Sequence, residues 1–255
     1  MVLSYNSEGN LRDYLQHNHS KLTLNDRITI LSYLCESLNY IHEKDLIHCD
    51  LHSGNMLVQG GGCFITDLGL CGPVDDESSG KLYGIVSYIA PELLRGTNNV
   101  KHTKKSDVYS VGMLMWEIFA GCPPFDDRAH NHHLIFDICE KGLRPPILPG
   151  IPEDYAQMMR KCWDMNPSKR PTMKELWDFS RNKLKKTINN SSSNNYINII
   201  SGSGSSSDSS QQIHKTHPLA YHMSRILDEE IAKSKSLKSN DSSLDDLDIN
   251  MLTLT

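Results

Sequence analysis

The stretch HCDLHSGNML, residues 48–57, decides the fold of this chain. It places Asp50 and Asn55 five residues apart, after His48 and ahead of a short apolar segment. An Asp-x4-Asn pair is a weak signal by itself, because such residues often cap turns. Its interpretation therefore depends on the motifs that follow it.

Four more motifs follow in order, namely TDLGL at 66–70, YIAPE at 88–92, SDVYSVG at 106–112 and CWDMNPSKRPT at 162–172. None of them is decisive alone, since an Asp-x-Gly is usually a turn. In this order and at this spacing, the five motifs resemble those of a eukaryotic protein kinase. The CW-x3-P-x2-RPT ending is most similar to the tyrosine-kinase-like and tyrosine-kinase branches. The resemblance covers residues 1–186.

The hydrophobic pattern predicts a mostly α-helical α+β domain over residues 1–186. Residues 24–42 place apolar side chains on one helical face, namely Leu24, Ile28, Leu31, Leu34, Cys35, Leu38 and Ile41. The nearly all-apolar residues 106–121 predict a buried central helix, with Ser106 as its cap and Gly121 at its end. Amphipathic helices are also predicted at 152–164 and 172–186.

A β-hairpin is the main strand signal. MLVQ at 56–59 and CFITDLGL at 63–70 flank the three glycines at 60–62. Such a hairpin would bring the end of HCDLHSGN and the start of TDLGL into one site. The resemblance implies a protein kinase-like fold, specifically the large lobe with a short catalytic-loop hairpin.

The resemblance also implies roles for three polar residues. Asp50 matches the catalytic aspartate that orients a substrate hydroxyl and accepts its proton. Asn55 and Asp67 match the ligands of Mg2+, and both supply the oxygen donors that this ion requires. The implied activity is ATP-dependent phosphoryl transfer to a protein substrate in signal transduction, with ATP and Mg2+ as cofactors and serine or threonine favoured as acceptor. A turn-capping role for Asp50 and Asn55 is the structural alternative.

Residues near the start of the chain resemble the nucleotide-binding hinge. Leu3 matches the gatekeeper, Ser4 and Asn6 match the hinge backbone, and Leu57 matches the apolar residue below the adenine. The glycine-rich loop, the strand lysine and the helix glutamate of a small lobe have no counterpart here. We therefore expect a large lobe whose small lobe is absent, either as part of a longer kinase or as a non-catalytic interaction protein.

Three positions depart from the usual kinase pattern. Cys49 replaces the arginine that receives an activation-segment phosphate, so the chain is of the non-RD type. His52 stands where serine/threonine kinases carry a lysine, and Ile85 stands where they carry a threonine. These departures keep open the alternative of a catalytically inactive pseudokinase that acts as an interaction scaffold.

Two histidine-containing clusters are alternative candidates for a metal or thiol site. One comprises His48, Cys49 and His52, and the other comprises His130, His132 and His133. In a Cys–His nucleophilic site the two side chains must face each other. Residues that are adjacent in sequence rarely do so, which disfavours the first cluster as such a site. The second cluster is expected to be a solvated loop.

Three charged residues are expected to support the site rather than to react. Asp107 resembles the buried aspartate that accepts hydrogen bonds from the catalytic-loop backbone around His48. Glu92 and Arg170 match a charged pair that joins the activation segment to the last helices.

The composition limits the possible partners and the location. The chain has 255 residues, a net charge of −5 and a sequence pI near 6.2, which give no reason to expect nucleic acid. The odd number of cysteines without a CxxC pair indicates reduced thiols. The longest apolar runs are too short to cross a membrane, and we expect a cytoplasmic protein.

Residues 187–255 differ in composition from the rest. They begin with a serine- and asparagine-rich stretch, which has too little apolar surface to offset the entropy of ordering, and we predict a disordered tail. The segment HPLAYHMSRIL, residues 217–227, is an isolated apolar patch that could dock on a partner or remain solvated. A short helix is possible within residues 217–238.

Overall fold

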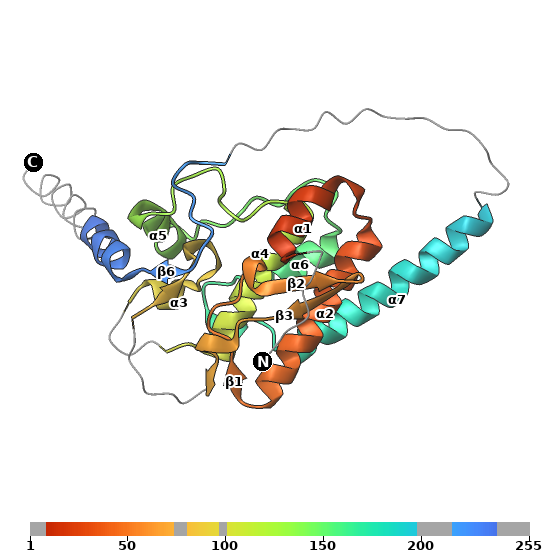
Figure 1. Ribbon diagram of the computed structural model, residues 1–255, viewed down its shortest axis with the longest axis horizontal. Coiled ribbons are helices and arrows are strands. Elements are labelled where there is room, and N and C mark those ends of the chain that lie inside the picture. The colour runs from red at the N-terminus through yellow and green to blue at the C-terminus, as the bar shows by residue number, and fades with distance from the viewer. Residues whose placement is uncertain (1–8, 74–80, 97–100, 198–215, 239–255) are drawn as a thin grey trace, which may run out of the picture.

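The computed structural model of the chain describes residues 9–73, 81–96, 101–197 and 216–238 (Figure 1). Its α-helices are α1 Leu11–Asn18, α2 Leu24–Glu43, α3 Pro91–Leu94, α4 Lys104–Ala120, α5 His132–Cys139, α6 Glu153–Cys162 and α7 Met173–Ile197. Its strands are β1 Leu46–Ile47, β2 Met56–Gln59, β3 Gly62–Ile65, β4 Gly72–Pro73, β5 Tyr83–Gly84 and β6 Arg225–Ile226. A further helix covers residues 228–238. The prediction of a mostly helical α+β domain is confirmed.

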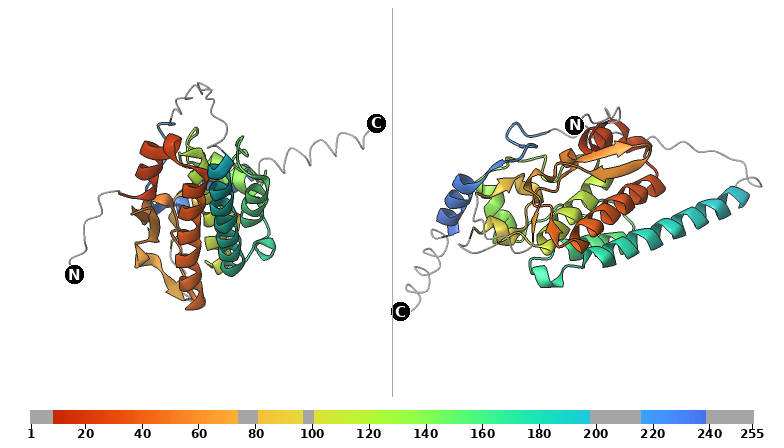
Figure 2. Two further views of the ribbon diagram at one scale, coloured as in Figure 1. Left: turned by 90° about the vertical axis from the view of Figure 1, so that its right-hand side faces the viewer. Right: turned by 60° about the horizontal axis from the view of Figure 1, so that its bottom comes forward.

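The main hydrophobic core surrounds α4, which packs against α2 and α6. Nearly every residue of α4 is buried, as its apolar sequence predicts, and Gly121 ends it in a left-handed conformation with φ of 77°. Helix α7 lies along α2, and α2 also packs against β3 (Figures 1 and 2). The molecule is thus built on two long neighbouring helices and one central helix.

The start of α4 differs from the prediction. Thr103, not Ser106, caps the helix, because the Thr103 hydroxyl accepts a hydrogen bond from the backbone N–H of Ser106. Ser106 in turn accepts one from the backbone N–H of Thr103 at 2.9 Å, which completes a capping box. Leu24, the first residue of α2, is 38% exposed and does not belong to the buried face of that helix.

The predicted hairpin is confirmed. Strands β2 and β3 pair antiparallel, with Leu57 opposite Phe64 and Gln59 opposite Gly62. The turn uses positive φ angles at Gly60 and Gly61, which glycine adopts without steric cost.

The last part of the chain is more ordered than the sequence predicts. Helix α7 continues to Ile197 and crosses the predicted boundary at residue 186, so the prediction of disorder is wrong for residues 187–197. Residues 198–215 lie outside the described residues. Residues 216–238 pack against the domain of their own chain, where Leu227 and Ile231 join a second buried cluster with residues of α3 and α5 (Figures 1 and 2).

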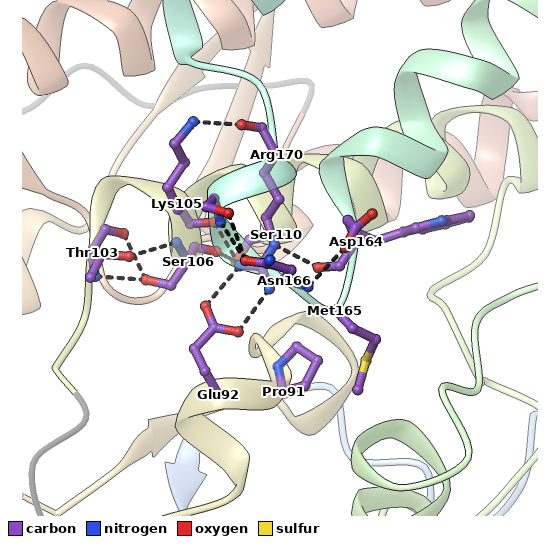
Figure 3. Close-up of polar contacts among 12 residues, drawn as sticks. Pro91, Glu92, Thr103, Lys105, Ser106, Ser110, Asp164, Met165, Asn166 and Arg170 are labelled. Carbon is purple, nitrogen blue, oxygen red and sulfur yellow. Dashed lines mark hydrogen bonds and ion pairs between the residues drawn. The ribbon is translucent and has the colours of Figure 1, made fainter.

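The predicted pair of Glu92 and Arg170 is present, with the Arg170 side chain buried and the Glu92 side chain 17% exposed (Figure 3). The Arg170 guanidinium donates two hydrogen bonds of 2.7 Å to the Glu92 carboxylate and others to the carbonyl oxygens of Asp164 and Lys105. The Arg170 side chain is 0% exposed, and its guanidinium lies 5.2 Å from the centre of the Tyr109 ring. This pair therefore joins α3 to the segment that leads into α7.

We predict that Arg170→Met lowers the free energy of unfolding by about 3–5 kcal/mol, because Glu92 would stay in a largely buried position without its partner. The measurement is urea-induced unfolding followed by circular dichroism. Lys174→Met is the matched control, since it removes the exposed ion pair with Asp178 and should cost less than about 1 kcal/mol. Equal losses for the two variants would contradict a special role for the buried pair.

Candidate active site

The loop that carries Asp50 is held in place by hydrogen bonds to Asp107, which lies in the first turn of α4. The buried Asp107 carboxylate accepts hydrogen bonds from the backbone N–H of His48 at 2.9 Å and of Cys49 at 3.2 Å. It also accepts one from His42 Nε2 at 2.9 Å. The role expected for Asp107 is thereby found in the structure.

Two local features then set the direction of Asp50. Cys49 adopts a left-handed backbone conformation with φ of 71°, which is uncommon for a residue with a side chain. The backbone N–H of Asp50 donates to His48 Nδ1 at 3.3 Å, while His48 Nε2 lies 3.2 Å from the carbonyl oxygen of Thr66. His48 therefore ties the loop to the end of β3.

Asp50 and Asn55 form a direct contact. The Asn55 amide nitrogen Nδ2 lies 3.0 Å from the backbone carbonyl of Asp50 and 3.3 Å from its Oδ2. Because Nδ2 is the donor of this amide, the Asn55 Oδ1 atom is the one suited to a metal ion. This hydrogen bond from Asn55 to Asp50 spans the turn between the two residues, so it is also compatible with the turn-capping alternative.

The hairpin brings Asp67 close to Asn55. The backbone N–H and hydroxyl of Thr66 both donate to the carbonyl oxygen of Asn55, each at 2.9 Å. Asp67 follows with φ of 55° and an exposed side chain whose Oδ1 accepts from the N–H of Gly69. Asn55 and Asp67 are therefore held by one short hydrogen-bonded connection and could supply oxygen ligands to one divalent cation.

The residues expected around a nucleotide are placed only in part. Leu57 is half-buried on β2, where it also forms an isolated bridge with Asn10. Leu3, Ser4 and Asn6 lie outside the described residues. Leu68, which follows Asp67 in the TDLGL motif, is 55% exposed because it lies in a surface 3-10 turn, Leu68–Leu70.

The electrostatic surroundings keep Asp50 ionised. Burial by itself raises the pKa of Asp50, but the His52 side chain and the Ser224 hydroxyl outweigh burial and lower that pKa below its ordinary value. His52 Nε2 lies 3.6 Å from Asp50 Oδ2. An ionised carboxylate is the form that can accept a proton from a hydroxyl group.

Sequence reasoning missed one member of the site, Ser224. Its hydroxyl lies 2.9 Å from Asp50 Oδ1 and 2.7 Å from Oδ2, and His52 Nε2 lies 3.0 Å from the same Ser224 oxygen. The only signal in the sequence is the apolar patch at 217–227, which is compatible with docking or with a solvated tail and gives no location for docking.

The second histidine cluster is not the solvated loop that we expected. His130 is buried, and its ring nitrogens lie within hydrogen-bond distance of the carbonyl oxygens of Phe125 and Tyr221.

Within the ranges that the structure describes, no group of three or more His, Cys, Asp or Glu residues could hold a metal ion by itself. None of the helices in these ranges is both long enough and apolar enough to cross a membrane.

Cys49 is predicted to be a poorly reactive thiol. Burial, followed by the nearby Asp107 charge, raises the pKa of Cys49 from 9.0 to about 12. At pH 8 this shift lowers its thiolate fraction roughly a thousandfold. We expect iodoacetamide to label Cys49 at least about a hundredfold more slowly in the folded chain than in urea, and about tenfold faster for each unit of rising pH.

Mass spectrometry of the alkylated peptide would measure this rate, with the urea-unfolded chain as the reference. Labelling of folded Cys49 at the unfolded rate would contradict the prediction and would reopen the reading of His48, Cys49 and His52 as a thiol site.

The chain is similar in sequence to known proteins. A family model described as "Protein tyrosine and serine/threonine kinase" matches residues 1–179. The chain is 32% identical over 179 residues to a mimivirus protein named "Putative serine/threonine-protein kinase/receptor", covering 69% of this chain and 11% of the relative. It is 33% identical over 166 residues to the dog protein named "Dual serine/threonine and tyrosine protein kinase", covering 64% of this chain and 17% of the relative.

A Dictyostelium discoideum protein named "Probable serine/threonine-protein kinase" is 30% identical over 184 residues, covering 71% of this chain and 13% of the relative. The chain thus spans between 11% and 17% of the length of these three relatives. The match to the family model covers more than half of the chain. The chain therefore belongs to the protein tyrosine and serine/threonine kinase family.

Proposed function

We propose that the chain is the substrate-binding and magnesium-binding part of a protein kinase that transfers phosphate to protein hydroxyls, serine or threonine being favoured. The observation that carries the proposal is the ionised Asp50 carboxylate, held in place by Asp107 and within hydrogen-bond distance of a serine hydroxyl. The family as a whole uses ATP with magnesium and acts on proteins.

The proposed reaction assigns one task to each residue. Asp50 orients the acceptor hydroxyl and takes its proton, which is the role of a general base. Asn55 and Asp67 would hold a magnesium ion through oxygen atoms, and Leu57 would contribute apolar surface next to the base of the nucleotide. When bound, magnesium and ATP supply the transferable phosphoryl group and neutralise the charge that develops during its transfer. Leu3, Ser4 and Asn6 are proposed to form the hinge side of the nucleotide site.

The finer placement within the family is also a proposal. The CWDMNPSKRPT segment, whose Arg170 forms the buried pair with Glu92, supports the tyrosine-kinase-like branch. The proposed domain comprises residues 1–186, with a tail after it, and the proposed location is the cytoplasm. Docking of the tail on a separate partner remains a prediction.

A pseudokinase that acts as an interaction scaffold is the second candidate function. His52 favours it, because a histidine replaces the lysine that in serine/threonine kinases touches the transferred phosphate. If the missing charge withholds about 3 kcal/mol from the transition state, the rate falls about a hundredfold. Such a loss would leave a slow enzyme rather than an inert one.

We predict that Asp50→Asn lowers phosphoryl transfer by about 10²–10⁴-fold, because an amide cannot accept the hydroxyl proton. Radiolabelled phosphate transfer to a generic protein substrate is the measurement, made on the chain joined to a kinase small lobe, with analysis of the labelled amino acid. Asp178→Asn is the control, since Asp178 is an exposed residue of α7. Unchanged transfer by Asp50→Asn would refute Asp50 as the base, and label on tyrosine alone would refute the favoured acceptor.

We further predict that the 255 residues by themselves transfer phosphate far more slowly than the same residues joined to a small lobe. Among the described residues, the site has oxygen ligands on the hairpin side but no glycine-rich loop over the phosphates. Positioning of the reacting groups is worth many powers of ten in rate. The same transfer assay on both proteins tests this, and equal rates would refute the need for a small lobe.

A further inference from the structure

Residues 216–238 lie beside α3 and α5 (Figures 1 and 2). They also contact Arg12 of α1 through the carbonyl oxygen of His222, and Asp50 through the hydroxyl of Ser224. We propose that this segment, here termed the docking segment, occupies the protein-substrate groove of its own domain and presents Ser224 as a phosphoacceptor. Its binding excludes other protein substrates until Ser224 is phosphorylated. The phosphoacceptor role rests on the function proposed above, whereas occupation of the groove does not.

The hydrogen bonds at Ser224 are those of an acceptor about to react. His52 Nδ1 accepts from the backbone N–H of Gly54 at 3.1 Å, so the proton of a neutral His52 lies on Nε2. That Nε2–H group points to the Ser224 oxygen at 3.0 Å, which leaves the Ser224 hydroxyl as the donor to Asp50. One lone pair of the Ser224 oxygen then remains for bond formation with phosphorus.

Main-chain pairing fixes the register of the docking segment at this point. Strand β6 pairs antiparallel with β5, with Arg225 opposite Gly84 and Ile226 opposite Tyr83. The backbone N–H of Leu227 donates to the carbonyl oxygen of Leu82 at 3.0 Å. Addition of a strand to an exposed edge is a common mode of peptide recognition, in which main-chain bonds supply affinity.

Gly84 makes this close approach possible. Its φ of 143° is accessible mainly to glycine, and a Cβ atom there would lie 2.8 Å from Ile89 and 3.4 Å from Asp50 Oδ1. A side chain at Gly84 would therefore strain the backbone and collide with Ile89, next to the point where β5 pairs with β6.

The docking segment is anchored on both sides of Ser224. After it, Leu227 is 0% exposed and Ile231 is 6% exposed in the cluster formed with α3 and α5. Before it, the carbonyl oxygen of His222 accepts a hydrogen bond from Arg12. Because contacts on both sides hold the segment, the position of Ser224 does not depend on the contact of its hydroxyl with Asp50 alone.

Polar contacts strengthen the anchors on both sides of Ser224. His222 Nε2 lies 2.7 Å from Asp126 Oδ1, and the Thr216 hydroxyl donates to Asp126 Oδ2 at 2.7 Å. The Arg225 guanidinium donates to the carbonyl oxygen of His130 at 2.6 Å and lies 4.4 Å from the centre of the Tyr221 ring.

The proposed step balances without any redox change. The Ser224 oxygen forms a bond to the γ-phosphorus of ATP, the bond from that phosphorus to the β–γ bridging oxygen breaks, and ADP leaves. The hydroxyl proton passes to Asp50 and then to water. The product phosphate carries a charge of about −1.5 to −2 and lies beside the Asp50 carboxylate, so repulsion favours release of the docking segment.

The first experiment maps phosphate. The chain joined to a small lobe is incubated with ATP and magnesium at several protein concentrations, and phosphopeptides are quantified by mass spectrometry. We expect Ser224 to be labelled with a rate constant that does not change with protein concentration, as an intramolecular reaction requires. Ser224→Ala should remove this label, whereas Ser236→Ala, on the helix that follows, should retain it.

The second experiment needs no catalysis. Hydrogen–deuterium exchange of the 255-residue chain should show protected amides at residues 82–84 and 225–227. Arg225→Glu and Leu227→Asp should each raise exchange at residues 82–84 at least about tenfold, because both weaken an anchor of the docking segment. In the active protein, both variants should lower the apparent KM for an added peptide of residues 216–238 by about tenfold, while Ser236→Ala leaves that KM unchanged.

The outcomes separate the two proposals. Labelling of a generic substrate without labelling of Ser224 would overturn the phosphoacceptor role and leave the proposed function intact. Labelling of no acceptor at all would overturn both the proposed function and the phosphoacceptor role. Exchange at residues 82–84 that is unprotected, or that neither variant changes, would overturn occupation of the groove.

Discussion

The carboxylate of Asp107 is the group on which the rest of the site depends. It is buried in the first turn of the central helix and accepts three hydrogen bonds, two of them from the backbone of His48 and Cys49. Those bonds hold Cys49 in a left-handed conformation and so set the direction in which Asp50 leaves the loop. A buried charge needs such donors to offset its desolvation. The packing of α4 in the core therefore fixes the position of Asp107, and through it the orientation of Asp50.

The sequence predicts the parts of this arrangement whose signals are local or carried by a motif. Periodicity indicates α2, a nearly all-apolar run indicates α4, and three glycines indicate the hairpin. The five motifs indicate Asp107 and the Glu92–Arg170 pair. It misjudges the cap of α4, because Thr103 and Ser106 satisfy each other's backbone N–H and either residue type is a good cap. It also misses Ser224, since this serine is 174 residues from Asp50 and no periodicity encodes so distant a contact.

The departure from lysine to histidine at position 52 has a structural consequence. His52 is buried, and the N–H of Gly54 occupies its Nδ1 atom, which directs Nε2–H toward the Ser224 oxygen. The side chain thus supplies a directed hydrogen bond in place of a full positive charge. Replacing lysine by histidine therefore suits the positioning of a hydroxyl group better than the neutralisation of charge on a phosphoryl group. It is consistent with an enzyme that is slow but selective for a docked segment.

The same reasoning explains how such a domain could be controlled without an arginine at position 49. In the usual pattern, that arginine receives a phosphate on the activation segment, and Cys49 cannot do so. Occupation of the groove needs no such receiver, because the docking segment is tethered to the domain and binds at an effective concentration in about the millimolar range. A protein substrate must therefore exceed that concentration or bind more tightly. One phosphate beside Asp50 reverses the balance through charge repulsion alone.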